Sequence, residues 1–348
     1  MDYVDLRSDT VTLPTPAMRE AMARAEVGDD VYGEDPTINR LQKMAAERMG
    51  KESGLFVPSG TMGNLASVLA HCGRGDEAMM GDLGHTFLFE AGGVAALGGV
   101  VPHTLPNQPD GTLKLEDLLG GIRNPNDPHH PLSRLAILEN THNRCGGVPL
   151  SVEYTRKVGE LAHAHGLRLH LDGARIFNAA VALNVPASEL AGPADSVTFC
   201  LSKALCAPVG SVICGSAEFI GHAHRIRKQL GGGMRQAGVL AAAGIVALEQ
   251  MVDRLADDHR RARQLAIGLA KIPGLQLTIA IPPSNMVFVS IDEKVLFSAA
   301  EVIARLYEHK VRVGAVGSRG FRLVTHYWID DEGVDRTLKA FAQVLSLA

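Results

Sequence analysis

Leu169-His170-Leu171-Asp172-Gly173-Ala174-Arg175 is the stretch that decides the fold of this chain, together with Ser202-Lys203 about thirty residues later. The apolar run 166–171 is typical of a buried strand, and it delivers the carboxylate of Asp172 at its end. A second strand-like run, 196–201, delivers the amine of Lys203. Because ligands of an open α/β sheet bind outside the carboxyl ends of its strands, we expect this acid and this amine to meet there.

An acid and an amine in this arrangement suit the chemistry of pyridoxal 5'-phosphate (PLP). The amine forms a Schiff base with the aldehyde of the cofactor, and the acid keeps the pyridine nitrogen protonated so that the ring accepts electrons. The alternative is purely structural: a buried ion pair between Asp172 and Lys203, or an aspartate that caps a helix. The two motifs alone do not decide between these interpretations.

Composition and charge are those of a soluble enzyme. Charged residues make up 21% of the 348 residues, and the formal net charge of −4 gives no electrostatic case for binding nucleic acid or a membrane surface. The five cysteines lack C-x-x-C spacing, which favours free thiols in a reducing compartment. Residues 1–5 do not resemble a signal peptide, and no apolar run approaches the length of a membrane span. We therefore expect a cytoplasmic protein.

Strand-like and helical segments alternate over residues 31–245, which predicts a large domain with a doubly wound, mainly parallel sheet. The segment 211–214 follows Lys203 too closely for a crossover helix, so we expect it to run antiparallel. The polar residues 1–30 are expected to form an N-terminal arm. A long helix over 241–272 and a smaller C-terminal α+β domain are expected within 246–348.

The sequence Ser59-Gly60-Thr61-Met62-Gly63-Asn64, between a predicted strand and a predicted helix, is the best candidate for a phosphate site. Backbone N–H groups and the helix dipole attract an anion, glycine allows close approach, and the hydroxyl of Thr61 adds a donor. An ordinary capped helix is the alternative. The sequence is not a Walker loop, because no Gly-Lys-Ser/Thr follows.

Two further segments are candidates for ligand contact. His85 lies in a loop beyond a strand end, where an imidazole could stack on a pyridine ring and move protons, although a surface histidine is the alternative. The glycine-rich run 231–236 lies between two predicted helices, which argues against a dinucleotide motif. It suits a place where the backbone passes near a ligand or a partner subunit, with Arg235 as the anion contact, or a flexible hinge.

A metal hydrolase built on histidines is a rival interpretation. His163, His165 and His170 lie near Asp172 in the sequence. However, His163 and His165 are two residues apart on a predicted helix, so they point to different faces and cannot chelate one ion together. We expect no metal site.

Taken together, these segments resemble the low-specificity L-threonine aldolases, PLP enzymes of fold type I, the aspartate-aminotransferase fold. The resemblance extends over nearly the whole chain. The matching blocks lie at residues 5–12, 27–36, 139–143, 170–175, 201–203, 231–236 and 322–326.

The resemblance implies a role for each residue near the cofactor. Lys203 would bind the aldehyde of PLP, Asp172 would pair with the pyridine nitrogen, and His85 would stack on the ring. Arg175 would lie beside the cofactor oxygen and close to the substrate. The remaining cofactor contacts implied are Gly60 and Thr61 at the phosphate, and Ser202.

The same resemblance implies contacts with the substrate and with a second subunit. Ser8 and Arg322 would hold the carboxylate of an amino-acid substrate, and His129 would approach its β-hydroxyl group. Tyr32 and Arg235 would come from a neighbouring subunit. The active form is therefore expected to be a homo-oligomer, a dimer or a tetramer, with shared active sites.

The implied activity is reversible cleavage of L-threonine, L-allo-threonine and related β-hydroxy-α-amino acids to glycine and an aldehyde. The sequence leaves the catalytic base open among His85, His129 and a bound water, and it does not choose between His129 and His130. It also leaves open the natural substrate and the threo or erythro preference. The alternatives are another fold type I PLP lyase or racemase, the metal hydrolase, and a non-enzymatic regulatory protein that retains the fold.

Overall fold

In the computed structural model, which describes residues 3–346, the chain forms two compact units. The larger unit comprises residues 14–252, and the smaller one combines the described residues up to 13 with those from 253 onward. From the sequence, we expected the large domain to extend from residue 31 to residue 245. Residues 3–13 group with the C-terminal part because strand β1 (Val4–Asp5) pairs in parallel with β11 (Val311–Arg312). Met1 and Asp2, part of the expected arm, lie outside the described residues.

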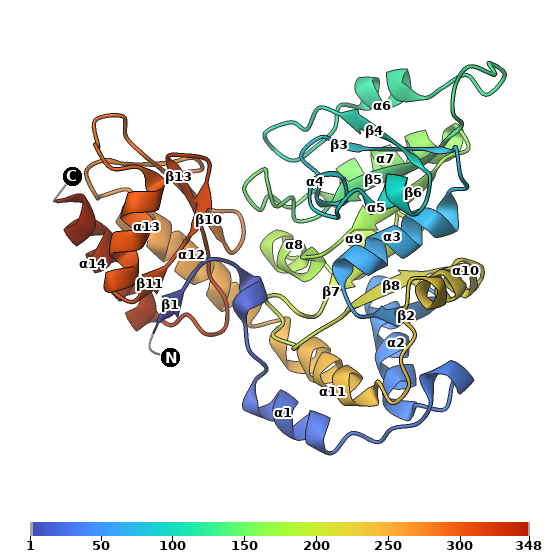
Figure 1. The fold of residues 1–348 in the computed structure, drawn as a ribbon, viewed down its shortest axis with the longest axis horizontal. Coiled ribbons are helices and arrows are strands. Elements are labelled where there is room, and N and C mark those ends of the chain that lie inside the picture. Colours follow the sequence, from blue (N-terminus) through green and yellow to red (C-terminus); the bar gives the residue numbers. More distant parts are fainter. Residues whose placement is uncertain (1–2, 347–348) are drawn as a thin grey trace. The chain divides into compact units, whose positions relative to one another are not determined.

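A seven-stranded sheet forms the centre of the larger unit (Figure 1). Its strand order is β2-β8-β7-β6-β5-β3-β4, and every strand except β8 points in the same direction, which confirms the predicted mainly parallel, doubly wound sheet. The strand after Lys203, β8, is antiparallel to both neighbours, also as predicted. The strands are β2 (Ser53–Val57), β3 (Glu77–Gly81), β4 (Val101–Leu105), β5 (Ser133–Glu139), β6 (Arg168–Asp172), β7 (Ser196–Cys200) and β8 (Ser211–Gly215).

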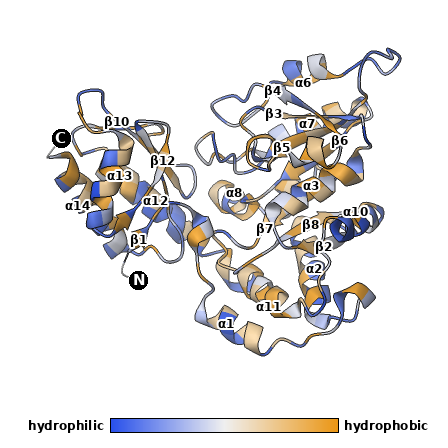
Figure 2. Cartoon of the chain, viewed as in Figure 1, coloured by the Kyte–Doolittle hydropathy of each residue, from blue (hydrophilic) through white to orange (hydrophobic). Residues whose placement is uncertain are grey.

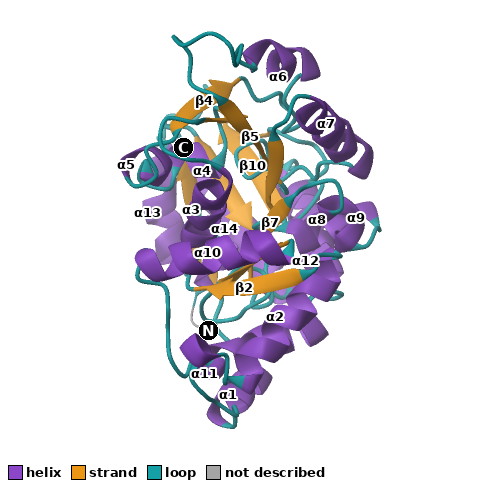
Figure 3. Ribbon diagram, turned by 90° about the vertical axis from the view of Figure 1, so that its right-hand side faces the viewer, coloured by secondary structure: helices purple, strands orange, loops and turns teal. Residues whose placement is uncertain are grey.

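Helices cover both faces of this sheet (Figure 3). One face carries α3 (Gly60–His71), α4 (His85–Leu88), α5 (Gly93–Ala96) and α10 (Ala217–Gln229). The other carries α2 (Pro36–Met49), α6 (Leu115–Gly121), α7 (Val152–Ala164), α8 (Ile176–Leu183) and α9 (Ala187–Ala191). The strands are apolar on both sides, as a sheet covered twice requires. Beside the sheet, α1 (Pro16–Ala23) packs on α11 (Gly238–Val246), whose apolar character is visible in Figure 2.

The single helix expected over 241–272 is wrong. The chain makes α11, one π-helical segment (Ala247–Met251) and then a separate helix, α12 (Leu255–Leu269). The interruption falls where the two units divide. Residues before it are buried within the larger unit, whereas Leu265 and Leu269 belong to the core of the smaller one, so the two halves bury their apolar faces in different cores.

The smaller unit is an α+β structure, as predicted. A four-stranded antiparallel sheet in the order β12-β13-β10-β9 is formed by β9 (Leu275–Leu277), β10 (Met286–Ile291), β12 (Gly314–Val316) and β13 (Gly320–Val324). The sheet packs with α12, α13 (Ala299–Glu308) and α14 (Asp331–Leu345) around one apolar core. In that core the rings of Phe321 and Phe341 meet edge to face at 5.7 Å.

Two further expectations can be compared with the structure. All five cysteines are buried and none forms a disulfide, as the sequence predicted. Among residues 3–346, no helix combines the length and the apolar character needed to cross a membrane.

Candidate active site

Asp172 is the last residue of β6, a strand with parallel neighbours on both sides. Its side chain is buried at the carboxyl edge of the sheet. Oδ1 accepts a hydrogen bond from the backbone N–H of Ala174 at 3.1 Å, and Oδ2 accepts one from Nδ2 of Asn64 at 2.8 Å. These two hydrogen bonds fix the orientation of the carboxylate at the edge of the sheet.

Lys203 lies three residues beyond the end of β7, the strand next to β6. The two parallel strands therefore deliver Asp172 and Lys203 to the same edge of the sheet. Both charges act on His85: the hydrogen bond with Glu90 is the main reason that the pKa of His85 is raised, Asp172 adds to the increase, and burial and Lys203 oppose it. The structure thus brings together three of the residues singled out from the sequence.

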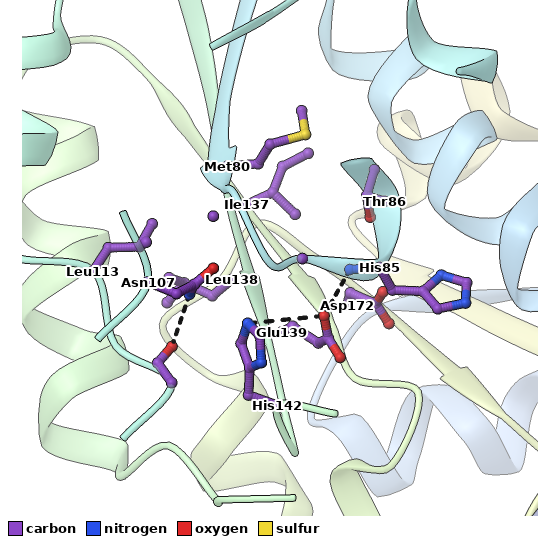
Figure 4. A pocket seen from close by; sticks show the side chains of 13 residues that line it. Met80, His85, Thr86, Asn107, Leu113, Ile137, Leu138, Glu139, His142 and Asp172 are labelled. Atoms are coloured by element: carbon purple, nitrogen blue, oxygen red, sulfur yellow. Dashed lines mark hydrogen bonds and ion pairs between the residues drawn. The ribbon is translucent and has the colours of Figure 1, made fainter. Parts of the chain in front are cut away.

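His85 is held at both its backbone and its ring. It begins α4, four residues after the end of β3, and its backbone N–H donates to Oε2 of Glu139 at 2.8 Å. Oε1 of Glu139 accepts the N–H of Asn143. The ring Nδ1 lies 2.9 Å from Oε1 of Glu90. Figure 4 shows His85 beside Asp172 at one end of a narrow cavity that Glu139 and His142 also line.

The N-terminus of α3 lies at the same edge of the sheet. Ser59 caps the helix, with its Oγ accepting the N–H of Met62 at 3.2 Å. A Cβ placed on Gly60 would lie only 2.9 Å from Sγ of Cys200, the last residue of β7, so glycine permits this close approach. The first turn of α3, with the hydroxyl of Thr61, thus presents backbone donors close to the segment that carries Ser202 and Lys203.

This edge of the sheet fits PLP. It offers a buried carboxylate for a pyridinium nitrogen, an amine for an aldehyde and a helix N-terminus for a phosphate. Arg175 is buried as well: it precedes α8, and its backbone N–H donates to the carbonyl of Asn140 at 3.4 Å. The roles of Arg175 and Ser202 towards a cofactor remain predictions.

Ser8 and Arg322 belong to the smaller unit. Ser8 caps the short 3-10 helix Asp9–Val11, with its Oγ accepting the N–H of Thr10 at 3.3 Å. Arg322 lies on β13, and its Nη2 donates to the carbonyl oxygen of Arg7, the residue before Ser8, at 3.2 Å. The two residues predicted to hold a carboxylate are therefore neighbours in space, although 314 positions apart in the sequence.

Tyr32 and Arg235 also lie close together. Tyr32 ends the 3-10 helix Asp30–Tyr32 and is 75% exposed. Arg235 pairs with Asp29 at 2.9 Å, and its carbonyl accepts the N–H of Asp30 at 3.1 Å. A buried ion pair of 2.7 Å between Asp30 and Arg227 fixes the same loop to α10. The glycine-rich run is thus bonded to the loop that carries Tyr32. In the single chain the side chains of Tyr32 and Arg235 face solvent.

His129 lies on an exposed loop, where its Nδ1 is 2.8 Å from Oδ1 of Asp127. Its approach to a substrate stays a prediction. The three histidines of the metal-hydrolase interpretation face different partners: His163 bonds to Asp195, His165 to the carbonyl of Leu161, and His170 to Asn64 and Ser196.

Sequence reasoning missed two residues of this site, Asn64 and Glu90. Both are buried, and Nδ2 of Asn64 lies 2.8 Å from Oε1 of Glu90 as well as from Oδ2 of Asp172. The available signal was a carboxylate five positions after His85, in an otherwise apolar and glycine-rich stretch. A buried carboxylate needs a partner, which makes such a residue a candidate for the site.

Comparison with known proteins agrees with this geometry. The family model of beta-eliminating lyases matches residues 5–293. The chain is 52% identical over 343 residues to the probable low-specificity L-threonine aldolase 2 of Arabidopsis thaliana, covering 98% of this chain and 97% of that protein. It is 46% identical over 329 residues to the low specificity L-threonine aldolase of Escherichia coli K12, covering 94% and 95%. The structure of a Leishmania major threonine aldolase superposes with a TM-score of 0.83 at 22% identity, covering 98% and 99% of the two chains. The chain therefore belongs to the beta-eliminating lyase family, among the low-specificity L-threonine aldolases, and has the fold type I architecture of PLP enzymes.

Proposed function

We propose that the protein is a PLP-dependent aldolase that reversibly cleaves L-threonine, L-allo-threonine and related β-hydroxy-α-amino acids to glycine and an aldehyde. The observation that carries the proposal is the meeting of Asp172, Lys203 and His85 at one edge of the sheet, beside the N-terminus of α3. The reaction is the one for which the similar proteins of Arabidopsis thaliana and Escherichia coli are named, cleavage of L-threonine.

Each residue at this edge has a proposed task. Lys203 would hold the cofactor covalently, Asp172 its ring nitrogen, and Arg175 its ring oxygen. Gly60 and Thr61 would hold the phosphate, and Ser202 would be a further contact of the cofactor. When bound, PLP supplies an electron-accepting ring for the electrons of the bond that breaks.

Substrate orientation is assigned to Ser8 and Arg322. By holding the carboxylate, they would set the torsion at Cα so that the Cα–Cβ bond stands perpendicular to the cofactor ring. Only in that orientation do the electrons of this bond overlap with the ring system. This requirement distinguishes an aldolase from a racemase. A racemase must hold the Cα–H bond, instead of the Cα–Cβ bond, perpendicular to the ring.

A base must also take the proton of the β-hydroxyl group. Nδ1 of His85 is engaged by Glu90, so Nε2 is the ring nitrogen left to accept a proton. His129 is the second candidate, and a bound water is the third. In the single chain His129 is 86% exposed at its side chain, so its participation requires that a substrate or a second subunit meet its loop.

Exposed apolar side chains support assembly into an oligomer. Tyr32, Phe87, Leu88 and Phe89 are between 39% and 75% exposed, and the last three are consecutive residues that begin two positions after His85. Contiguous exposed aromatic and aliphatic side chains are typical of interaction surfaces. We propose a homodimer or a homotetramer in the cytoplasm, in which Tyr32 and Arg235 complete the site of a neighbour.

The deciding experiment is product analysis with the PLP-loaded protein. Incubation with L-threonine should yield glycine and acetaldehyde in equal amounts, without 2-oxobutyrate or ammonia. Hydroxylamine, which captures the PLP aldehyde, should abolish the reaction, a metal chelator should not, and Lys203→Ala should be inactive. 2-Oxobutyrate and ammonia, the products of β-elimination from threonine, would instead support the second candidate, a β-eliminating PLP lyase, a reaction that the description of the matching family names. A protein that fails to bind PLP would contradict both.

A further inference from the structure

Asn64 joins two carboxylates of the candidate site. It lies on α3 and is 2% exposed. Its Nδ2 is 2.8 Å from Oδ2 of Asp172 and 2.8 Å from Oε1 of Glu90. An amide nitrogen carries two hydrogens and a carboxylate oxygen accepts, so one N–H goes to each acid. The side-chain oxygen of Asn64 must therefore face the opposite way.

That oxygen begins a chain of buried polar groups. Oδ1 of Asn64 is 3.3 Å from Nε2 of His170, whose Nδ1 is 2.8 Å from Oγ of Ser196, which is in turn 2.7 Å from Nε2 of His71. Burial lowers the pKa of His170 to about 3, so its ring is neutral and carries one proton. Because Oδ1 of Asn64 can only accept, we infer that this proton is on Nε2.

The direction of every bond in the chain follows. Nδ1 of His170 is an acceptor, so Ser196 donates its hydroxyl hydrogen to it. The oxygen of Ser196 is then free to accept from Nε2–H of His71. All donors point from His71 towards Asp172, so the chain fixes which end of the Asn64 amide faces the two carboxylates.

Glu90 extends the chain to the other side of the site. Its Oε1 accepts from Asn64 and lies 2.9 Å from Nδ1 of His85, while its Oε2 is buried without a hydrogen-bond partner among residues 3–346. Potential metal-ligand atoms of His85, Glu90 and Asp172 lie within 4.8 Å of one another. In this structure the amide nitrogen of Asn64 bridges the two carboxylates of that group.

We propose that Asn64 and Glu90 are positioning residues of the active site. Asn64 orients the carboxylate of Asp172 towards the cofactor nitrogen, and it orients the carboxylate of Glu90 towards His85. The chain His170–Ser196–His71 fixes the orientation of the Asn64 amide. This inference rests on the proposed function, because it assigns Asp172 and His85 to a bound PLP ring. It predicts that a substitution of Asn64 changes two contacts together: the one between Asp172 and the ring nitrogen of the cofactor, and the one between Glu90 and His85.

The first test needs no cofactor. In PLP-free protein labelled with ¹⁵N-histidine, long-range ¹H–¹⁵N spectra should show His170 as the neutral tautomer with its proton on Nε2. A proton on Nδ1 would overturn the proposal, because Asn64 would then lack its donor. The result is independent of whether the protein cleaves threonine.

The second test measures PLP binding in variants. Asn64→Leu removes the amide at similar volume, and the dissociation constant of PLP should rise by about tenfold to a hundredfold, the effect of losing a hydrogen bond to a charged group. The visible absorbance spectrum of the bound cofactor, and its pH dependence, should change as well. Glu90→Gln should alter the spectrum, whereas Glu90→Asp should restore part of the wild-type behaviour.

Ser196→Ala decides the matter if Asn64→Leu does not fold. This substitution breaks the hydrogen-bonded chain at Ser196, which is separated from Asp172 by His170 and Asn64. It should change the cofactor spectrum and the PLP affinity in the same direction as Asn64→Leu, but by less. Ser67→Ala is the matched control: it removes another fully buried serine hydroxyl, which among residues 3–346 bonds within α3 to the carbonyl of Gly63, and should leave the spectrum unchanged. Wild-type spectra and PLP affinity in Ser196→Ala would overturn the proposal, even if the wild-type protein proves to be a threonine aldolase. If the wild-type protein bound no PLP, the proposed function would fail with it.

Discussion

At the scale of single residues, the candidate site separates a covalent task from an electrostatic one. Lys203 is placed by the turn after β7 and Asp172 by the end of β6, so the two groups are held by different neighbouring strands. A cofactor bound between them would be fixed at its aldehyde and at its ring nitrogen. Each contact can be tested alone.

Lys203 should be the lysine that becomes attached to PLP when the loaded protein is reduced with borohydride. It follows a buried strand beside the one that carries Asp172, and its charge reaches His85. Peptide mapping by mass spectrometry reads the result directly, and Lys203→Ala should lose the label. A label on Lys228, close to the glycine-rich run, would contradict the assignment.

Asp172→Asn should still bind PLP, although more weakly than the wild type, and should lose most of its activity. A neutral amide cannot hold the proton on the pyridine nitrogen, so kcat/KM for L-threonine should fall by about a hundredfold or more, as expected when a charged group facing the reacting system is lost. Exchange of the α-proton of glycine with deuterated solvent, followed by NMR, gives a second readout. An exchange rate equal to that of the wild type would show that Asp172 does not act on the ring.

His71 gives stability a dependence on pH. Burial lowers the pKa of His71 to about 4, below its ordinary value of 6.5, so the folded state binds fewer protons than the unfolded state between these values. Stability is therefore lost as the pH falls through 6.5, by about 2 kcal/mol at pH 5 for this group.

The measurement is urea unfolding at pH 7 and pH 5. In His71→Gln this contribution is absent, so the stability gap between wild type and variant should shrink on acidification. The exposed His222 supplies the matched control, His222→Gln, which should leave the pH dependence as it is. A gap of constant size in His71→Gln would mean that His71 protonates normally in the folded protein.

At the scale of elements, α3 connects the parts of the site. Its N-terminus is the candidate phosphate site, Asn64 contacts Asp172 and Glu90 one turn later, and His71 lies about 10 Å farther along the helix axis. This arrangement requires α3 to pack closely on the sheet. Gly63 faces β7, and a Cβ there would lie 2.5 Å from Cγ2 of Thr198.

Gly63→Ala should therefore destabilise the protein, by about 1–3 kcal/mol as overpacking of a core commonly does, and weaken PLP binding because α3 is displaced. Gly221→Ala is the matched control: this helical glycine of α10 has open space around it, and alanine there should add about 0.5–1 kcal/mol of stability. Urea unfolding midpoints separate the two. Equal effects would mean that α3 can move away from β7 without cost.

The elements of the larger unit could be predicted because each one has a local signal. Apolar runs marked the strands, and the short connection after Lys203 marked β8 as antiparallel. The end of the α-helix α11 at Val246 has no such local signal. It depends on which of the two hydrophobic cores α11 and α12 pack into, and this is decided by the tertiary structure. The strands β11 and β12 were not predicted, since two or three residues carry no periodicity.

The candidate site shows the same division. Lys203 and Asp172 were visible because each follows its own strand in the sequence. Asn64 and Glu90 were not visible in the sequence. The role of Asn64, an asparagine inside an apolar helix, depends on partners that lie 26 and 108 positions away. The chain through His170 and Ser196 likewise exists only after β6, β7 and α3 have come together.

At the scale of the whole molecule, one chain leaves part of the proposed machinery facing solvent. Tyr32 is 75% exposed, and Arg235 is 56% exposed at its side chain although it pairs with Asp29. The loop that carries them is not loose, because the buried pair of Asp30 and Arg227 fixes it. A rigid loop that presents an aromatic and a cationic side chain outward suits a contact with a second subunit, and closed two-fold assemblies are the commonest form of such contacts.

Mixing two inactive variants tests whether the sites are shared. Lys203→Ala and Arg235→Ala should each be inactive alone, but after subunit exchange a hybrid dimer contains one site with both wild-type residues, so part of the activity should return. Lys203→Ala mixed with Asp172→Asn is the control: both residues lie at the same edge of one sheet, every hybrid site lacks one of them, and activity should stay absent. Exchange is verified by mass spectrometry of differently labelled subunits. If exchange is complete and the first mixture remains inactive, Arg235 serves the site of its own subunit, and its exposure in the single chain has another cause.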